Sequence, residues 1–408
     1  MKIVRIIARL NVGGPARHVV WLTKKLQNDE FESVLIAGTV PDGEEDMGYF
    51  ATKHGVEPIY IPELSRELSP KDIISLYKIY RELRRQKPDI IHTHTAKAGT
   101  VGRIAAFLYR WMTLRTLIGK PRPVKVIHTF HGHVFHSYYG KLKTRFFILI
   151  ERILALVATK KIVVITQQQF REIHNVFGVG SAGQFEIIPL GIELNELSVA
   201  SSRSILRNEI DAGVDDIVVG FVGRLTEIKD VPLLLNAIAL YNNSAEPQKP
   251  KLKVVIVGDG NVREELEDLS VNLGLNGVVN FLGNRGNIGE LLAGMDIVAL
   301  TSKNEGTPLS LIEGMAAGKP VISTVVGGVI DLLGNRSEEF DSFAVCERGI
   351  SVDNAAPESF SRGLIYLAKN EKLRQDIAAS GRDFVQKKYS VDRLVKDLSA
   401  LYISLTKG

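Results

Sequence analysis

Residues Glu305 to Pro320 read EGTPLSLIEGMAAGKP, and this stretch decides how the rest of the chain is interpreted. An apolar run over 297–300 comes just before it and predicts a buried strand. A Gly-Thr-Pro loop then leads into a helical pattern over 309–317, which Gly318 is placed to end. The backbone amides at a helix start lack intrahelical partners, so we expect this point to bind an anion such as a phosphate.

Two carboxylates flank this predicted anion site. Glu305 lies in the loop, and Glu313 lies eight residues further on, about one turn inside the helix. A carboxylate repels phosphate but accepts hydrogen bonds from the hydroxyl groups of sugars. The pair therefore predicts a ligand with a sugar on each side of a diphosphate. The spacing alone is also compatible with an ordinary capped helix that carries exposed glutamates.

Length and composition indicate a two-domain globular protein. The chain has 408 residues, of which 45% are apolar and 24% charged. Its single cysteine, Cys346, excludes an intrachain disulfide and a cysteine-based metal cluster, and we expect it to be a small buried apolar residue. Arg5 and Arg9 interrupt the first apolar run, which therefore predicts a strand and not a signal peptide. No apolar run approaches the ~20 residues that span a bilayer, so we expect a soluble, cytoplasmic protein.

Positive charge is concentrated in the first half of the chain. The formal net charge is +5, but residues 1–200 hold 28 Lys and Arg against 18 Asp and Glu, and the remainder holds 23 against 28. Residues 81–161 alone hold 17 basic and 3 acidic residues. This excess favours an anionic partner, namely a membrane surface, a lipid phosphate or a nucleic acid. A solvated basic face without a partner would give the same composition.

Strand and helix patterns alternate along both halves of the chain. In the first half we expect strands over 2–8, 34–37, 59–62, 89–95, 124–130, 161–165 and 187–190, and helices over 16–26, 70–86, 97–109 and 138–157. A small, polar linker over 198–204 precedes a second series. There we expect strands over 217–222, 253–257, 278–282, 297–300 and 321–323, helices over 231–241, 263–273, 288–293 and 309–317, and a helical last third that ends with 391–405.

This alternation predicts two doubly wound α/β domains in tandem, with ligands at the carboxyl ends of the strands in the cleft between the domains. Gly13 and Gly14 follow the first strand and would let a ligand approach the backbone closely, although a simple tight turn would also use them.

Several motifs together resemble one enzyme family. Gly223-Arg224-Leu225, the Lys229-Asp230 pair and the stretch over 305–320 resemble the retaining GT-B glycosyltransferases often called group 1 or family 4, of the bacterial type that builds polysaccharides and glycolipids. The glycine pair and His131 after a strand also match, and the resemblance runs the length of the chain. It implies an α/β fold of GT-B architecture, with two Rossmann-like parallel-sheet domains. Residues 1–197 with 389–408 would bind the acceptor, with the final helix returning to this domain, and residues 205–388 would bind a nucleotide-sugar donor.

The resemblance also implies roles for the matched residues. Catalytic roles are implied for His131, Arg224, Lys229 and Glu305. Donor binding is implied for Gly13, Gly14, Arg224, Lys229, Asn284, Arg285, Glu305, Gly306, Thr307, Pro308, Leu309 and Glu313. Within that set, the arginine and the lysine would contact the diphosphate, Glu313 the ribose, Glu305 the transferred sugar, and the loop at 284–285 the nucleobase. On the acceptor side we expect His133 and Lys97.

Two features concern the predicted diphosphate site, namely the lack of a metal-binding sequence and the residue after Lys229. No D-x-D sequence occurs in the chain, and we expect two cations, Arg224 and Lys229, to stabilise the leaving diphosphate without a metal ion. Asp230 stands where the family often has glycine, and we expect its side chain to cap the next helix.

Six histidines gather near two strand ends: His92, His94, His128, His131, His133 and His136. No carboxylate or cysteine accompanies them, so we expect a polar acceptor cleft and no metal, with His92 and His128 as core histidines inside strands.

We therefore expect a metal-independent, retaining glycosyltransferase without a cofactor, which moves a sugar from a nucleotide-sugar, such as a UDP-sugar, to a glycan or a polyprenyl-linked acceptor. The basic residues Arg103, Arg110, Lys141, Lys143 and Arg145 favour an acceptor held at an anionic membrane, on the inner face of the cell membrane. A nucleotide-sugar 2-epimerase of the same architecture is one alternative. A basic protein that binds nucleic acid or a membrane surface is another, but it would not explain the two glutamates, and the aromatic residues needed to stack bases are lacking.

Overall fold

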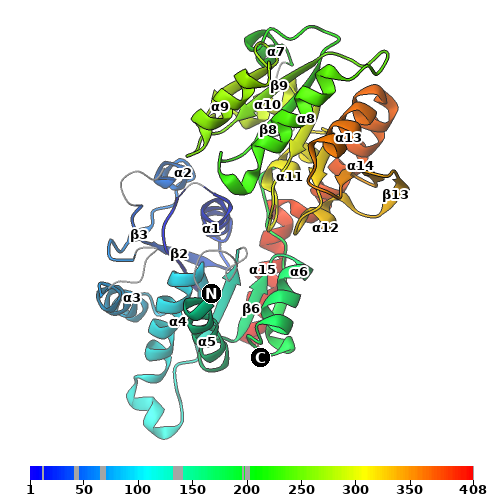
Figure 1. Ribbon diagram of the computed structural model, residues 1–408. Coiled ribbons are helices and arrows are strands. Elements are labelled where there is room, and N and C mark those ends of the chain that lie inside the picture. The colour runs from blue at the N-terminus through cyan, green and yellow to red at the C-terminus, as the bar shows by residue number, and fades with distance from the viewer. Residues whose placement is uncertain are drawn as a thin grey trace. The chain divides into compact units, whose positions relative to one another are not determined.

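The computed structural model describes residues 1–11, 13–40, 46–64, 70–131, 141–194, 197 and 203–407, without the side chains of 141 and 142. They form two compact units, Met1–Ile192 with Val391–Gly408, and Glu193–Ser390 (Figure 1). The family resemblance predicts these boundaries at residues 197 and 389. Each unit is a sheet covered by helices on both faces, the Rossmann-like α/β arrangement expected from the sequence.

Unit 1 holds a seven-stranded parallel sheet in the order β3-β2-β1-β4-β5-β6-β7. Its strands are β1 (Lys2–Ile7), β2 (Glu32–Ala37), β3 (Ile59–Tyr60), β4 (Ile90–His94), β5 (Lys125–Phe130), β6 (Lys161–Val164) and β7 (Phe185–Ile187). Its longer helices are α1 (Gly14–Lys25), α3 (Asp72–Gln86), α4 (Ala96–Trp111), α5 (Lys141–Val157) and α15 (Val391–Lys407). Short turns of helix are α2 (Gly48–Lys53), η1 (Leu114–Ile118), α6 (Gln167–Phe170), η2 (Arg171–Val176) and η3 (Ala182–Gln184).

The central strand β1 shows why unit 1 has helices on both faces. Val4 lies in one apolar cluster with Ile79 of α3 and Ala105 of α4. Its neighbour Ile3 lies in another cluster with Leu22 of α1. Because side chains alternate across a strand, the neighbours Ile3 and Val4 point to opposite faces, and both faces of the sheet are therefore buried.

The last helix of the chain belongs to unit 1. In α15, Leu394, Leu398 and Tyr402 are buried in the same cluster as Ile3, and the backbone N–H of Val391 donates to the carbonyl of Ile192. The family resemblance implied this return, but amphipathicity alone could not say which sheet the helix covers.

Unit 2 holds an eight-stranded sheet in the order β10-β9-β8-β11-β12-β15-β14-β13. Its strands are β8 (Ile217–Val222), β9 (Leu252–Val257), β10 (Val279–Gly283), β11 (Ile297–Leu300), β12 (Val321–Thr324), β13 (Arg336–Glu339), β14 (Ala344–Cys346) and β15 (Gly349–Val352). Its helices are α7 (Ser204–Glu209), η4 (Glu227–Lys229), α8 (Val231–Asn243), α9 (Arg263–Asn272), α10 (Ile288–Gly294), α11 (Leu309–Ala316), α12 (Val329–Leu333), α13 (Pro357–Lys369) and α14 (Glu371–Tyr389).

The expectation of a wholly helical last third was wrong. Residues 336–352 form β13, β14 and β15, and β13–β14 and β14–β15 pair antiparallel at one edge of the sheet. These strands are only three or four residues long, so they hold too few residues to show a clear period of two. Cys346 is buried in β14, as expected, and burial raises the pKa of its thiol.

The strand order fixes where each unit can bind a ligand. Among the parallel strands the order reverses between β1 and β4 in unit 1 and between β8 and β11 in unit 2. Loops that leave neighbouring strands in opposite directions open a crevice at the carboxyl ends of those strands. The loops expected to bind ligands are therefore those that follow β1, β4, β8 and β11. In the part of the chain that the structure describes, none of the helices is long and apolar enough to cross a membrane.

Candidate functional site

An ion pair joins the two loops at the reversal point of unit 2. Lys229 follows β8 and ends η4, while Glu305 follows β11. The Lys229 Nζ lies 2.5 Å from Oε1 of Glu305, and the Ser302 hydroxyl donates to the same oxygen at 2.6 Å. The Thr301 hydroxyl donates to the backbone carbonyl of Lys229 at 3.0 Å, so main chain and side chain are both held. Tertiary structure thus brings together two residues that are 76 positions apart.

A helix start lies beside this ion pair. Helix α11 begins at Leu309, and its N-cap residue, Pro308, offers no side-chain hydrogen bond. The amides of the first turn therefore have no intrahelical acceptors. The buried hydroxyl of Thr307 has no hydrogen-bond partner among the described residues. These donors face the loop that carries Glu305, and the helix dipole favours an anion there.

Both glutamates of the organising stretch are buried, at 8% exposure for Glu305 and 9% for Glu313. The alternative of a capped helix with exposed glutamates is therefore wrong. Arg224, in the loop after β8, is exposed, and within the described chain its side chain forms no hydrogen bond or ion pair. Unit 2 thus presents a free guanidinium, a paired ammonium, two buried carboxylates and a helix start along one sheet edge.

Close backbone contacts hold these loops in place. Gly327 has φ +51°, and a Cβ there would lie 1.8 Å from the carbonyl oxygen of Glu305. The Gly328 N–H donates a hydrogen bond to the same carbonyl oxygen at 3.1 Å. Gly258 has φ +131°, and a Cβ there would lie 2.0 Å from the carbonyl oxygen of Gly223. Only glycine fits these two positions, so they fix the loops that carry Arg224 and Glu305.

The expected helix cap at Asp230 is absent. Asp230 occupies the N-cap position of α8 but makes no side-chain capping bond, and its Oδ2 lies 3.6 Å from the Nζ of Lys303. Its backbone is left-handed, with φ 45° and ψ 47°. Asp and Asn tolerate this region better than most residues, and glycine does so best. The conformation therefore explains why aspartate can stand where the family often has glycine.

The predicted nucleobase loop lies at the same edge, after β10. Asn284 is exposed there. Arg285 turns toward α7, where its guanidinium pairs with Glu209 and donates to the Leu282 carbonyl at 3.2 Å. Arg285 is therefore held by its own unit, and a role toward the base rests on Asn284 and the backbone of this loop.

In unit 1, three histidines meet at the carboxyl edge of the sheet. His18 lies in the second turn of α1, His94 ends β4, and His131 follows β5. The Nδ1 of His94 lies 2.9 Å from Nε2 of His131, and the rings of His18 and His131 contact edge to face at 4.7 Å. His18 and His94 are buried, and neither nitrogen of His18 has a hydrogen-bond partner among the described residues.

Burial keeps these imidazoles neutral. It lowers the pKa of His131 to about 4 and is also the first cause that holds the pKa values of His18 and His94 well below the ordinary 6.5. Inside the strands, His92 is satisfied at both nitrogens by Tyr402 and Thr129, as expected of a core histidine. Nε2 of the other expected core residue, His128, has no partner among the described residues.

The three histidines could also hold a metal ion. One ligand nitrogen from each of His18, His94 and His131 lies within 4.8 Å of the others, and neutral imidazole is a good ligand for zinc-like ions. The His94–His131 hydrogen bond, however, already pairs two of these nitrogens. Absence of a functional metal remains a prediction.

The backbone beside the cluster is strained. Thr95 directly follows His94 and has φ 65° and ψ 158°, a region that is almost exclusive to glycine. The first turn of α4 holds it there, since the Gly99 N–H donates to the Thr95 carbonyl at 2.8 Å. Gly13, in the loop after β1, has φ +155°, and Gly14 begins α1. Both glycines therefore lie at the reversal point of unit 1, as the phosphate-loop interpretation expects.

Two predicted basic residues are engaged inside unit 1. Lys97 is buried, and its Nζ lies 2.7 Å from Oδ1 of Asp72 on α3. Arg103 was expected on the basic surface, but it is fully buried and forms an ion pair of 2.6 Å with Glu151 on α5. That expectation was wrong because α5 covers this face of α4. His133 and His136 lie outside the described residues.

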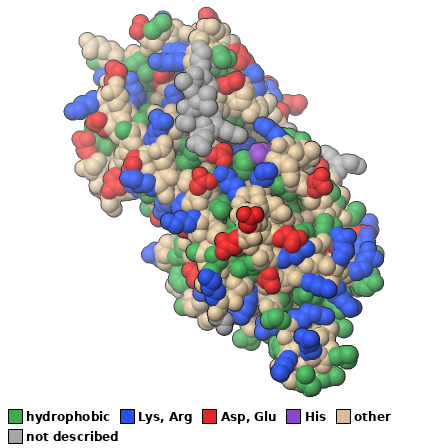
Figure 2. Space-filling view, turned by 180° about the vertical axis from the view of Figure 1, so that it is seen from behind, with side chains coloured by type: hydrophobic (Ala, Val, Ile, Leu, Met, Phe, Trp, Pro, Cys, Tyr) green, Lys and Arg blue, Asp and Glu red, His purple; other side chains and the backbone are tan. Residues whose placement is uncertain are grey.

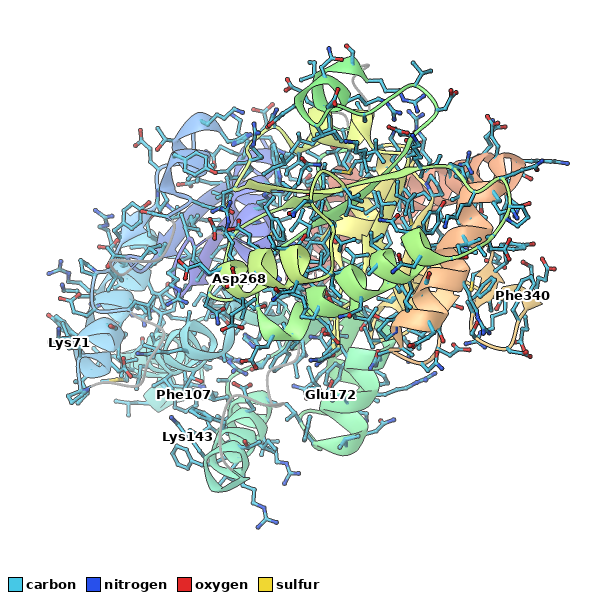
Figure 3. All side chains as sticks on the ribbon, turned by 45° about the horizontal axis from the view of Figure 1, so that its top comes forward. Lys71, Phe107, Lys143, Glu172, Asp268 and Phe340 are labelled. Carbon is cyan, nitrogen blue, oxygen red and sulfur yellow. The ribbon has the colours of Figure 1, made fainter. Side chains whose placement is uncertain are left out.

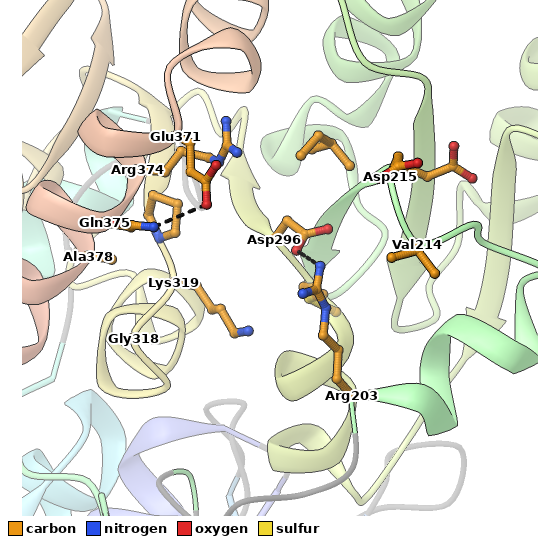
Figure 4. A pocket seen from close by; sticks show the side chains of 14 residues that line it. Arg203, Val214, Asp215, Asp296, Gly318, Lys319, Glu371, Arg374, Gln375 and Ala378 are labelled. Atoms are coloured by element: carbon orange, nitrogen blue, oxygen red, sulfur yellow. Dashed lines mark hydrogen bonds and ion pairs between the residues drawn. The ribbon is translucent and has the colours of Figure 1, made fainter.

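A pocket of 460 Å³ lies at the other edge of the unit 2 sheet (Figure 4). Ile217, Asp296 and Pro320, which line it, stand at the amino ends of β8, β11 and β12. Asp296 there is paired with Arg203, and Lys319 donates to the Ala293 carbonyl at 3.0 Å. The pocket is therefore remote from the loops that carry Glu305, and its charges serve the packing of the sheet edge.

Sequence reasoning missed several members of the site. Ser302, which holds Glu305, and His18, which contacts His131, were not identified, whereas His94 was named only among the histidines of the predicted acceptor cleft. Thr95 was missed as well. The polar pair Thr301-Ser302 after the predicted strand over 297–300 was the available signal for Ser302, whereas Thr95 fell at the end of the predicted strand over 89–95. For His18, a histidine on the apolar face of the helix after the glycine pair was the only sign.

Comparison with known proteins gives consistent results. Residues 12–196 match the family model described as "Glycosyltransferase Family 4", and residues 202–384 match "Glycosyl transferases group 1". The UDP-Gal:alpha-D-GlcNAc-diphosphoundecaprenol alpha-1,3-galactosyltransferase of Escherichia coli is 28% identical over 390 residues, which cover 93% of this chain and 91% of that protein. The capsular polysaccharide biosynthesis glycosyltransferase CapM of Staphylococcus aureus is 24% identical, over 82% of each chain.

Solved structures share the fold. Anabaena Alr3699/HepE in complex with UDP and glucose superposes with a TM-score of 0.77 at 20% identity, over 99% of this chain and 100% of that one. At this identity the likeness concerns the architecture alone.

Proposed function

The chain belongs to the glycosyltransferases of group 1 and family 4, and from this we propose that it transfers the sugar of a UDP-sugar to a lipid-linked glycan acceptor. The observation that carries the proposal is the ion pair of Lys229 with buried Glu305 at the reversal point of unit 2, beside the start of α11. There a cation, a carboxylate and unpaired amides lie within one loop cluster, which suits a diphosphate joined to a sugar.

In the proposed reaction the bond from the sugar C1 to the diphosphate breaks and its electron pair leaves with the diphosphate. The acceptor hydroxyl forms the new bond to C1, and its proton passes to the departing diphosphate. Negative charge grows on the departing diphosphate. Arg224 and Lys229 would stabilise this charge, together with the amides at the start of α11. The sequence has no D-x-D, and we propose that these cations replace a divalent metal. Retention of configuration is proposed from the family resemblance.

Glu305 has a role toward the sugar that fits its contacts. Lys229 and Ser302 both bond to Oε1, and among the described residues none donates a hydrogen bond to Oε2. We propose that Oε2 accepts a hydroxyl of the transferred sugar and that Glu313 accepts the ribose hydroxyls. A catalytic role is proposed for His131 of unit 1 from the family resemblance, and its neutral imidazole can donate or accept a hydrogen bond without adding charge.

The acceptor is proposed from the relatives. The Escherichia coli protein is named for a diphosphoundecaprenol-linked substrate, and the Staphylococcus aureus protein for capsular polysaccharide synthesis. A polyprenyl-diphosphate sugar at the inner face of the cell membrane is accordingly the acceptor class that we propose. A nucleotide-sugar 2-epimerase is not favoured, because the relatives reported above are glycosyltransferases.

A donor screen in EDTA tests the proposal. Ligand binding to the native state raises the melting temperature by mass action. We expect a clear shift with UDP and with one UDP-sugar, and product formation that requires a polyprenyl-diphosphate sugar. A shift only with GDP or ADP would contradict the choice of base. Product formed from the donor alone would support the epimerase, and activity that returns only with added Mg²⁺ or Mn²⁺ would contradict metal independence.

A further inference from the structure

Unit 1 carries an exposed apolar segment between α4 and β5 that the sequence analysis did not identify. We call Trp111, Met112, Leu114, Leu117 and Ile118 the apolar tip. Their exposed fractions are 39%, 60%, 84%, 84% and 70%. In Figure 1 this segment projects from the end of α4, away from the sheet of unit 1. Single exposed apolar residues are common on protein surfaces, but five within eight positions mark an interaction site.

The tip is held outward by an ordered backbone. Its core is the 3-10 helix η1, whose N-cap Thr113 accepts a bond from the Arg115 N–H at 3.3 Å and whose C-cap Gly119 is left-handed. At its base the Arg122 N–H donates to the Arg110 carbonyl at 3.1 Å, and the Arg122 guanidinium donates to the Tyr109 carbonyl. The apolar side chains are therefore presented to solvent by the fold itself.

Cations surround the tip and acids do not. Residues 90–150 contain ten Lys and Arg and no Asp or Glu, but two of the ten, Lys97 and Arg103, are buried in ion pairs and do not reach this surface. Arg115 and Lys120 are exposed beside the apolar residues, and the Arg110 guanidinium lies 5.3 Å from the centre of the Trp111 ring. Figure 2 shows basic and apolar side chains gathered at this end of unit 1. The surface therefore has the charge pattern that complements a layer of anionic headgroups.

The neighbouring helix extends the same surface. Helix α5 packs on α4 through the Arg103–Glu151 ion pair, and its outer side exposes Phe146, Leu149 and Leu156 at 54%, 53% and 83%. In Figure 3, Phe107 of α4 and Lys143 of α5 lie on the same side of unit 1. An apolar projection with a basic surround suits the boundary between headgroups and acyl chains, where the aromatic ring of a tryptophan is also favoured.

We propose that the apolar tip inserts into the surface of an anionic phospholipid bilayer, with Arg115 and Lys120 on lipid phosphates and α5 lying along the membrane. This inference deepens the lipid-linked acceptor proposed above, and it places the acceptor-side unit where such a lipid resides. It requires neither the donor site nor the identity of the sugar, so the two proposals can fail separately.

Tryptophan fluorescence gives a direct test, since the chain has only two tryptophans. Trp21 is buried in α1, whereas Trp111 belongs to the tip. The full chain is mixed with vesicles of POPG and POPC in equal parts, or of POPC alone. Insertion predicts a blue shift of Trp111 emission and quenching by brominated lipid with the anionic vesicles. The Trp111→Phe variant should show no shift, because Trp21 stays in the core.

Two kinds of variant separate the contribution of apolar insertion to vesicle binding from the contribution of charge. Leu114→Asp with Leu117→Asp should weaken vesicle binding by roughly 100-fold, at about tenfold for each buried leucine. Val214→Asp with Val271→Asp, at two exposed valines of unit 2, is the matched control and should bind vesicles like wild type. Arg115→Ala with Lys120→Ala should weaken binding to POPG vesicles and make it less sensitive to salt. Binding of UDP should be unchanged in every variant.

Three other outcomes overturn the proposal. Equal vesicle binding by the aspartate variant would show that the tip does not insert. A dimer that the same substitutions dissociate, with no vesicle binding, would assign the tip to a second copy of the chain. Salt-sensitive binding to duplex DNA without vesicle binding would assign the basic surface to nucleic acid. Loss of UDP binding in the wild type would contradict the proposed donor but leave the membrane result standing.

Discussion

The buried histidines of unit 1 predict a sharp loss of stability in mild acid. Burial lowers the pKa of His131 to about 4, and it is the first cause that holds the pKa values of His18, His92, His94 and His128 well below 6.5. As the pH falls through 6.5 the unfolded chain takes up protons on these imidazoles, while the folded chain does not. The free energy of unfolding must therefore decrease from pH 7 toward pH 4.

The magnitude follows from the His131 values. A folded pKa of about 4 against an unfolded value of 6.5 lowers the free energy of unfolding by up to about 2 kcal/mol between pH 7 and pH 5. The other four histidines act in the same direction. Since a whole domain is typically stable by only ~5–15 kcal/mol, the loss from His131 alone is a sizeable fraction of the stability of unit 1.

Urea unfolding followed by the emission of Trp21 measures this directly. Trp21 is buried in α1, the helix that also carries His18, and Trp111→Phe makes it the sole tryptophan. His131→Gln should reduce the difference between pH 7 and pH 5 by about 2 kcal/mol. His174→Gln, at a half-buried histidine outside the cluster, is the comparison substitution. A wild-type difference below about 1 kcal/mol, or an equal difference in His131→Gln, would refute the reasoning.

Further predictions concern the loops of both units. Lys229→Ala should lower kcat by roughly 100-fold, because the ammonium group that stabilises the charge on the leaving diphosphate would be absent. Turnover equal to wild type would contradict this role for Lys229. Glu313→Gln should raise the donor KM about tenfold with little change in kcat, because Glu313 would bind the ribose equally well in the ground state and in the transition state. A loss confined to kcat would contradict this role. Gly327→Ala should reduce both donor binding and the melting temperature, because its Cβ would meet the carbonyl of Glu305 at 1.8 Å, whereas Gly183→Ala in unit 1, with no atom within 4 Å, should match wild type. Thr95→Gly should raise the free energy of unfolding by about 1 kcal/mol in urea titrations through relief of the strained φ, and a loss of stability would show that the strain is absent.

Several features of the site could be predicted from the sequence because they depend on neighbours along the chain. The loop, helix and glycine stop over 305–318 follow from local turn and helix signals, and Gly318 does end the helix with φ +71°. The alternation of strands and helices required two parallel sheets. The identities of Lys229, Glu305 and Glu313 required a family resemblance, since spacing alone was compatible with an ordinary helix.

The sequence by itself therefore determined the fold class, the loops that carry the chemistry and the excess of positive charge. Tertiary structure alone decided which of these residues meet. Lys229 reaches Glu305 because β8 and β11 are neighbours in the sheet although 76 residues separate the two side chains. His94 reaches His131 in the same way across β4 and β5. Tertiary structure also decided that Arg103 is buried while the apolar tip is exposed, because burial depends on which elements pack together and not on the polarity of one residue.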